Sequence, residues 1–307
     1  MPGADVCLPF ILSGGAFRGR LVRLTAAATE ILKTHQDPEP VSLLLAEAMA
    51  AAVALASGLK YKGVFTLQVQ GKGAVHTLVT DITSEGDLRG CTKFDPDEVA
   101  AEIARARGRS MPHLLGPGAH LSFTVDQGPD TERYQGIVEL SGETLADAIH
   151  HYFRQSEQLE SALKIVSSAP KDGAGPWTAA ALLLQRMPED GGVPIANREE
   201  NDDVWRTAVI LMSSVKDSEL LDVTLPPERL LHRLFATLDV AAAKARPLAA
   251  RCRCSRERSE RILASFPVEE VKSYAEDGKI HMTCEFCRAD YVFSESDIEA
   301  IADQHRA

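Results

Sequence analysis

The sequence lacks the short motifs that mark the commonest enzyme classes. It contains no GxSxG, no HExxH, no glycine-rich loop ending in GK[ST], and no GxGxxG after a predicted strand. Its nine histidines are scattered, and none has metal-ligand spacing from a pair of cysteines. The glycine-rich residues 13–22 are therefore interpreted as a loop that leads into the first strand or helix. No catalytic residue and no organic-cofactor-binding residue is predicted.

Positive charge and long apolar runs are also scarce. There are 33 basic and 44 acidic residues, and the net charge of −11 argues against a general nucleic-acid coat or an anionic membrane surface. The N-terminus lacks the basic region of a signal peptide. The longest apolar run, residues 41–59, is barely long enough to span a membrane and carries Glu47, so it predicts a buried helix. We therefore expect a cytoplasmic protein without a membrane partner.

Cysteine is rare, but four of the six cysteines gather near the C-terminus as a CxC and a CxxC pair. They are Cys252, Cys254, Cys284 and Cys287. Thiolates paired at such short spacing are the ligands that a tetrahedral metal needs, so the sequence predicts one Zn²⁺ bound by these four sulfurs. A pair of catalytic or structural disulfides remains open as another redox state of the same site. The other two cysteines, Cys7 and Cys91, are predicted to be structural thiols.

The order of predicted elements indicates an α+β fold. Strands are predicted from residue 64 to residue 94, at 120–126 with 134–140, at 163–167 and at 179–187. Helices are predicted at 26–34, 41–59, 96–107 and about 144–159, and residues 6–12 are expected to form a loop or an edge strand. Because strands and helices do not alternate regularly, we expect a mixed, mainly antiparallel sheet domain over residues 1–188.

Two further regions follow this core domain. Residues 189–245 are predicted to be an acidic loop, reaching Asp203, and then a helical linker with amphipathic helices at 204–215 and 228–238. Residues 246–307 are predicted to be a small C-terminal zinc module, in which the CxxC pair lies at the bend of a hairpin. This module has few large apolar side chains, so it needs a further source of stability, such as a bound zinc ion.

The same spacing makes the four cysteines a plausible redox switch. Oxidation of either pair removes two zinc ligands, expels the metal and loosens the module. Extended Cα atoms in a CxC pair lie about 6.5–7 Å apart, near the upper limit of disulfide geometry, so a disulfide there should be easily reduced. Six arginines surround the first pair, where they either hold its negative charge or form a solvated helix face with Glu257 and Glu260.

Several stretches resemble one known family. They are Cys252-Arg-Cys-Ser-Arg-Glu-Arg258, Glu276-Asp-Gly-Lys-Ile-His-Met-Thr-Cys-Glu-Phe-Cys287, Tyr291-Val-Phe293, Arg18-Gly-Arg-Leu-Val22, Glu132-Arg-Tyr-Gln-Gly136 and Tyr152-Phe-Arg-Gln-Ser-Glu-Gln-Leu159. Together they resemble the redox-regulated heat-shock chaperones of about thirty-three kilodaltons, over nearly the whole chain.

The resemblance implies an ATP-independent holdase, not an enzyme, that is inactive while zinc is bound. It implies that oxidation joins Cys252 to Cys254 and Cys284 to Cys287, releases zinc, and unfolds the zinc module and the helical linker. The oxidised protein would bind unfolding client proteins, often as a homodimer. We expect the helices at 204–215 and 228–238 to bind clients, with the apolar stripe of Leu230, Leu231 and Leu234.

The sequence departs from the family pattern at two places, and two other classes of function are kept as alternatives. Arg288 stands where the family usually has glycine, and residues 189–203 look longer and more acidic than usual. The alternative function is a zinc-module nucleic-acid-binding or redox-sensing regulatory protein, for which the arginines would contact phosphates, although the overall acidity makes nucleic acid an unlikely partner. A thiol oxidoreductase is the third hypothesis, disfavoured because its CxxC lies outside a βαβ unit.

Overall fold

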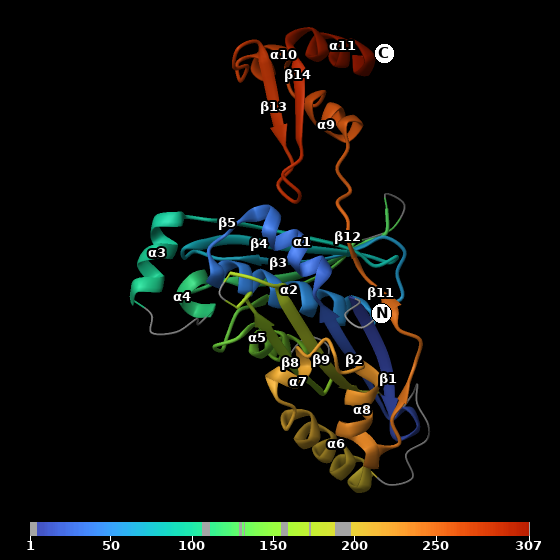
Figure 1. Ribbon diagram of the computed structural model, residues 1–307. Coiled ribbons are helices and arrows are strands. Elements are labelled where there is room, and N and C mark those ends of the chain that lie inside the picture. Colours follow the sequence, from blue (N-terminus) through green and yellow to red (C-terminus); the bar gives the residue numbers. More distant parts are fainter. Residues whose placement is uncertain are drawn as a thin grey trace. The chain divides into compact units, whose positions relative to one another are not determined.

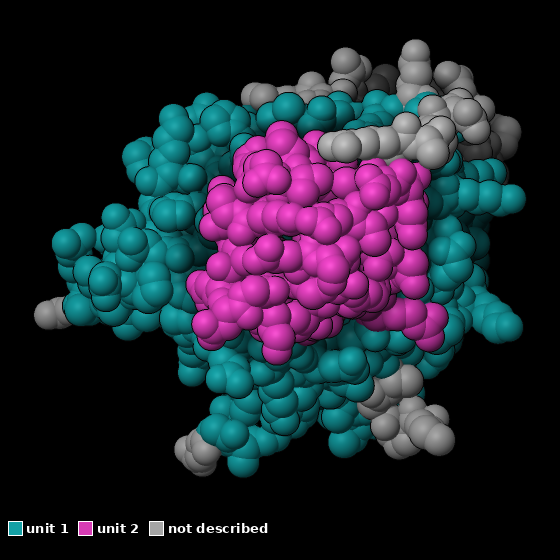
Figure 2. Space-filling view, turned by 90° about the horizontal axis from the view of Figure 1, so that it is seen from above, with its two compact units in different colours: residues 1–250 teal, residues 251–307 magenta. Residues whose placement is uncertain are grey.

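The structure is a computed structural model that describes residues 5–105, 111–128, 131, 133–154, 159–171, 173–187 and 198–306. The chain forms two compact units, residues 1–250 (unit 1) and residues 251–307 (unit 2), which are teal and magenta in Figure 2. Most of the chain, and both of its large sheets, belong to unit 1.

Unit 1 contains two six-stranded sheets (Figure 1). The first sheet has the order β10-β1-β2-β9-β8, with β11 also paired to β1, and all its pairs are antiparallel. Its strands are β1 (Val6–Leu12), β2 (Phe17–Leu24), β8 (Ser161–Ser168), β9 (Thr178–Arg186), β10 (Ala241–Ala242) and β11 (Arg246–Pro247).

The second sheet has the order β12-β5-β4-β3-β6-β7, and only the pair of β12 with β5 is parallel. Its strands are β3 (Val64–Gln70), β4 (Val75–Thr83), β5 (Asp87–Phe94), β6 (His120–Asp126), β7 (Tyr134–Glu139) and β12 (Ala249–Ala250). The predicted antiparallel pair of β6 with β7 is present, and the predicted α+β class with mainly antiparallel sheets is confirmed.

The expectation of a loop or edge strand at residues 6–12 needs correction. β1 is a full strand that pairs with β2 along its whole length and lies inside the sheet order. Pro9, which suggested a break, has no backbone N–H to give to a second neighbour. β11 pairs with residues 6 and 7 and β10 with residues 10 and 11, so the two short strands leave Pro9 between them.

The core of unit 1 is built around α2 (Glu39–Ala56), which lies between the two sheets (Figure 1). It is buried at every position except Glu39, Pro40 and Glu47. By length and composition it is the one helix of the described residues that could cross a membrane, but 83% of its apolar window is buried inside the protein. The predicted buried helix is therefore confirmed. The shorter helices of this part are α1 (Ala26–His35), η1 (Ser13–Gly15), α3 (Pro96–Arg105), α4 (Met111–Leu115) and α5 (Leu145–Tyr152).

A second apolar cluster forms on the other side of the first sheet, where helices from residues 198–238 pack. They are α6 (Arg198–Ser213), α7 (Asp217–Leu220), α8 (Pro227–Phe235) and η4 (Ala236–Leu238). Phe235 stacks on Phe10 with ring centroids 5.7 Å apart, and Trp205 contacts Phe17 at 5.5 Å. The Arg23 guanidinium donates to the backbone carbonyls of Leu220 at 2.7 Å and of Glu219 and Leu225.

These helices begin earlier than the sequence indicates. Residues 198–203, predicted as the end of the acidic loop, form the first turns of α6, while residues 188–197 lie outside the described part of the chain. Since α6–α8 pack on the first sheet, they belong to unit 1, and the proposed boundary between a core domain (1–188) and a linker (189–245) stays a prediction.

Unit 2 has a hairpin, three helices and a small core of its own. Its elements are α9 (Arg256–Leu263), α10 (Val268–Lys272), β13 (Lys279–Thr283), β14 (Asp290–Ser294) and α11 (Glu295–Arg306). Its buried apolar residues are Val271, Ile280, Phe293, Ile298 and Ile301. The predicted hairpin is present, with Ile280 opposite Phe293.

Candidate metal centre

Two backbone segments of unit 2 supply the four cysteines. Cys252 and Cys254 lie in an extended segment just before α9, whose first turn is capped by the Ser255 hydroxyl, an acceptor from the Arg258 backbone N–H at 3.2 Å. Cys284 and Cys287 lie at the bend between β13 and β14. The fold thereby brings together residues about thirty positions apart.

The bend has a defined backbone geometry. The Arg288 backbone N–H donates to the Cys284 carbonyl at 2.8 Å, and the Cys284 N–H donates to the Ala289 carbonyl at 2.8 Å. Arg288 itself has φ of 57°, a left-handed conformation that costs roughly 1 kcal/mol when a side chain is present. Arg288, which stands where the family usually has glycine, thus has a positive φ.

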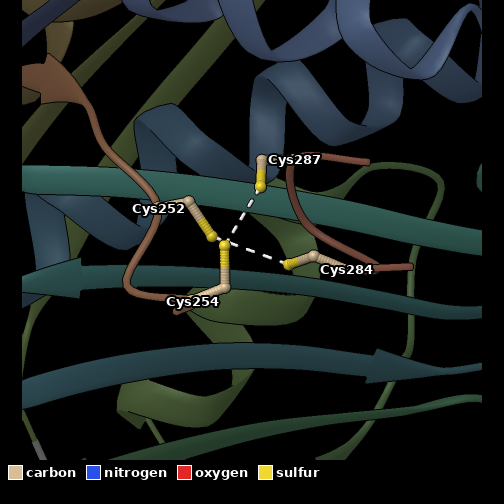
Figure 3. A group of neighbouring side chains, drawn as sticks. All are labelled: Cys252, Cys254, Cys284 and Cys287. Atoms are coloured by element: carbon tan, nitrogen blue, oxygen red, sulfur yellow. Dashed lines mark hydrogen bonds between the residues drawn. The ribbon is translucent and has the colours of Figure 1, made fainter. Parts of the chain in front are cut away.

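The four sulfurs form one compact cluster (Figure 3). All lie within 4.8 Å of one another; the Sγ atoms of Cys252 and Cys284 are 3.7 Å apart, and those of Cys254 and Cys287 are 3.3 Å apart. A tetrahedral Zn²⁺ with Zn–S bonds of about 2.3 Å places its sulfurs about 3.8 Å apart. The donor set and its spacing therefore fit a metal ion. No disulfide joins any of the six cysteines in this structure.

The electrostatics of the cluster also call for a cation. Burial raises the pKa of the Cys284 and Cys287 thiols, and the neighbouring sulfurs raise both further because a second nearby thiolate is repelled. A bound divalent cation reverses this effect, since it stabilises thiolates directly. A bound divalent cation would therefore favour the thiolate form of all four sulfurs.

Tyr291 contacts the sulfur cluster, which the sequence did not predict. Its hydroxyl donates to the Cys254 sulfur at 3.2 Å, and this hydrogen bond is the main cause that raises the pKa of Tyr291 to about 12. The sequence indicated only a return strand here. The contact joins residues 37 positions apart and depends on where the extended CxC segment meets the hairpin.

One of the six arginines near the first cysteine pair has a clear structural role. The Arg256 guanidinium lies 4.3 Å from the centre of the Phe293 ring and donates to the Val292 carbonyl at 2.9 Å. It also forms ion pairs with Glu260 and Asp297. Arg256 thus ties α9 to β14 and α11. Its pairing with Glu260 agrees with the alternative in which these arginines form a helix face with acidic partners.

The two remaining cysteines belong to unit 1. Cys7 is buried in β1, where burial raises the pKa of its thiol, and Cys91 is half-buried in β5. Neither is a member of the four-sulfur cluster.

The model of the Hsp33 protein family matches residues 5–294. The "33 kDa chaperonin" of Caulobacter vibrioides (strain NA1000 / CB15N) is 40% identical over 289 residues, which are 94% of each chain. The chain belongs to the Hsp33 family. The "33 kDa chaperonin" of Pseudomonas syringae pv. tomato is 36% identical over 301 residues, which cover 97% of this chain and 93% of that protein.

A solved structure supports the fold. The crystal structure of the 33 kDa chaperonin (heat shock protein 33 homolog) from Thermotoga maritima superposes with a TM-score of 0.78, covers 99% of both chains and is 21% identical. The relatives are named 33 kDa chaperonins and the Hsp33 family is non-enzymatic, which confirms the expectation that this member of the family is not an enzyme.

Proposed function

We propose that this protein is a redox-regulated holdase whose switch is one Zn²⁺ bound by Cys252, Cys254, Cys284 and Cys287. The observation that carries the proposal is the cluster of four sulfurs within 4.8 Å, set in a unit with only five buried apolar residues. Structural zinc contributes roughly 10–16 kcal/mol of apparent binding energy, more than such a small core supplies. Removing the metal therefore removes most of the stability of unit 2.

Oxidation is the proposed trigger in the reducing cytoplasm. Each pair of zinc-bound thiolates gives two electrons to one hydrogen peroxide, which takes up two protons from solvent and leaves as two waters while a disulfide forms and Zn²⁺ departs. Family membership supports pairing between neighbours, Cys252 with Cys254 and Cys284 with Cys287. In the reduced cluster, sulfur contacts shorter than 4 Å join Cys252 to Cys284 and Cys254 to Cys287, between the two segments. All four sulfurs lie within 4.8 Å of one another, so pairing within each segment requires only a short movement.

The proposed client-binding surface is the apolar face of α6 and α8, and the oxidised protein is proposed to form a homodimer. Leu230 and Leu231 are buried and Leu234 is half-buried, all in the cluster that packs on the first sheet. An amphipathic face of this kind binds apolar client segments only after it separates from the sheet. Because of this requirement, the surface would bind no client in the reduced protein and would bind clients in the oxidised protein.

The deciding experiment follows aggregation of a heat-unfolded client by light scattering, without ATP. Zinc-loaded reduced protein should leave the client to aggregate, and protein treated with hydrogen peroxide or hypochlorite should suppress it. Zinc release, followed with a chromogenic chelator, and the mass of the oxidised species should change in parallel.

Two variants provide matched controls. Cys91→Ser removes a thiol outside the cluster and should respond like the wild type, whereas Cys284→Ser/Cys287→Ser should hold zinc poorly and lose the oxidant response. If neither redox state protects the client, the holdase proposal is wrong. A salt-sensitive shift of DNA or RNA would instead favour the regulatory alternative.

A further inference from the structure

A pocket of about 590 Å³ opens in unit 1 just beyond the C-terminal end of α2. The first sheet contributes residues of β2 and β9 to its lining, and the second sheet contributes residues of β3 and β6. Ligand sites for small molecules typically measure about 300–1,000 Å³. The pocket is therefore large enough for a compact organic ligand.

Three sequence stretches outside the cysteine region meet at this pocket. Arg18 and Arg20 come from the Arg-Gly-Arg stretch, Tyr134 from the Glu-Arg-Tyr-Gln-Gly stretch, and Tyr152 and Phe153 from the third. These are the stretches that carried the family resemblance in unit 1. The proposed zinc switch uses none of them, so their meeting at one cavity needs another explanation.

The Arg-Gly-Arg stretch presents both arginines on one face of β2, because alternate residues of a strand point the same way. Gly19 faces the other way, where an added Cβ would lie 2.0 Å from the Phe10 ring. Glycine is thus required between the two arginines so that Phe10 can pack on the strand. Further along the same face, Val22 and Leu24 fill the core around α2.

Among the described residues, no carboxylate compensates the positive charge of this pair. Arg20 is only 7% exposed; its Nη1 donates to the Gln185 side chain at 2.8 Å, and its Nε is buried without a hydrogen-bond partner. Across the described part of the chain, no carboxylate forms an ion pair with Arg18 or Arg20, and no acidic residue is among those found to line the pocket. Burial lowers the pKa of Arg20, although a guanidinium remains protonated at neutral pH.

A third arginine in the lining provides a contrast. Arg186 forms ion pairs with Glu160 and Asp202, each at 2.6 Å. Its charge is therefore neutralised within the protein, as expected in a chain of net charge −11. Arg18 and Arg20 have no ion pair with a described carboxylate, whereas Arg186 beside them has two, and this contrast points to a ligand as the source of negative charge.

Six aromatic residues also line the pocket, together with Lys60 and several aliphatic and amide side chains. Phe123 lies 6.1 Å from Phe65 and 4.8 Å from Tyr152, centroid to centroid, and the Tyr134 and Tyr152 hydroxyls are 3.1 Å apart. Tyr152 is seated against Gly136, where an added Cβ would lie 2.6 Å from its hydroxyl. These rings come from the second sheet and α5, whereas the arginines come from the first sheet.

We propose that this pocket binds a small amphipathic carboxylate. The carboxylate accepts hydrogen bonds from Arg18 and Arg20, and the apolar body of the ligand lies against Phe65, Phe123 and Tyr152. The site is separate from the proposed redox function, since every lining residue belongs to unit 1 and none is a cysteine.

Calorimetric titration of the reduced, zinc-loaded full chain with dodecanoate, below its micellar concentration, tests the proposal. Dodecyltrimethylammonium, with the same chain and opposite charge, is the matched ligand control. Dodecanoate should bind with one-to-one stoichiometry, and the cation should bind at least about tenfold more weakly, because charge-assisted hydrogen bonds supply the difference. Equal binding of the two amphiphiles, or none of either, overturns the proposal.

Two variants locate the site. Arg18→Gln alters an exposed side chain and should weaken dodecanoate binding about tenfold, whereas Lys33→Gln removes one charge from the exposed face of α1 and should change nothing. Arg20→Gln should weaken binding at least as much; if it fails to fold, Arg18→Gln still decides. Dodecanoate affinity unchanged in Arg18→Gln would show that binding occurs elsewhere and would refute the assignment.

Discussion

The two units of this chain are stabilised in different ways. Unit 1 surrounds a helix that is buried at all but three of its 18 positions, between two six-stranded sheets. Unit 2 buries five apolar residues and gathers four sulfurs. Hydrophobic burial does not depend on redox state, whereas a thiolate–metal cluster does. The comparison indicates why an oxidant would act first on unit 2 and leave the core around α2 folded.

Removing zinc should produce the largest difference between the units. With a chelator, or in Cys284→Ser/Cys287→Ser, we expect the amides of β13, β14 and α11 to exchange rapidly, because roughly 10–16 kcal/mol of metal binding is lost. The amides of α2 should stay protected. Hydrogen exchange read by mass spectrometry, with zinc measured on the same sample, checks both. Continued protection of unit 2 without zinc would mean that its apolar core suffices.

Truncating one buried phenylalanine in each unit should have the second-largest effect. The change in unit 2 should lower zinc affinity, and the change in unit 1 should lower thermal stability. Phe293 and Phe17 are both fully buried, and each change to alanine should cost about 3–5 kcal/mol. In Phe293→Ala that loss should appear as zinc affinity lowered by roughly a hundredfold or more, since folding and metal binding are coupled in unit 2. Phe17→Ala should lower the melting temperature of unit 1.

Chelator competition and calorimetry on the two variants give the measurement. Zinc affinity in Phe17→Ala should match the wild type. Equal loss of zinc affinity in both variants would contradict the view that the units are stabilised independently.

Shortening the apolar stripe of α8 should have a smaller effect on client capture in the oxidised state, although the loss of two buried leucines also lowers the stability of unit 1 in both states. Leu230→Ala/Leu231→Ala/Leu234→Ala should weaken client capture by at least about tenfold, because even one fully buried leucine contributes about 1.5–3 kcal/mol. Arg229→Gln, an exposed change on the same helix, is the control. Aggregation assays at graded chaperone concentrations give the affinity, and unchanged capture by the triple variant would move the client surface away from α8.

Prediction from the sequence worked best where signals were local. The CxxC bend, the strands on either side of it and the buried helix at 41–59 each follow from a short pattern of residues. β1 was misjudged because Pro9 suggests a break, and only the placement of β10 and β11 on either side of it makes the proline tolerable. The start of α6 was missed because an acidic stretch looks like a loop.

The long-range features could not be predicted in this way. The hydrogen bond from Tyr291 to Cys254 depends on a contact across 37 positions. Arg18 and Arg20 were placed in a loop, whereas the structure sets them on a strand at the edge of a cavity lined by both sheets. Glycine content indicated a turn, but Gly19 is there because Phe10 packs on it.

Relieving backbone strain should have the smallest effect on stability. It allows a direct comparison of the units, because each contains a residue with nearly the same positive φ. Arg288 and Gln36 both have positive φ, 57° and 56°, the first beside Cys287 and the second at the C-terminal end of α1. Arg288→Gly should stabilise unit 2 by about 1 kcal/mol, seen as roughly fivefold tighter zinc binding. Its exposed ion pair with Glu285 contributes little against this.

Two controls interpret this change. Arg288→Ala keeps a Cβ and should leave zinc affinity near the wild-type value, so a gain in both variants would trace the effect to lost charge. Gln36→Gly relieves the same strain in unit 1 and should raise its melting temperature by a few degrees at most without altering zinc binding. Competition with a zinc chelator resolves a fivefold difference. Because unit 2 has little other stability, a change this small should also raise the oxidant concentration needed to release the metal.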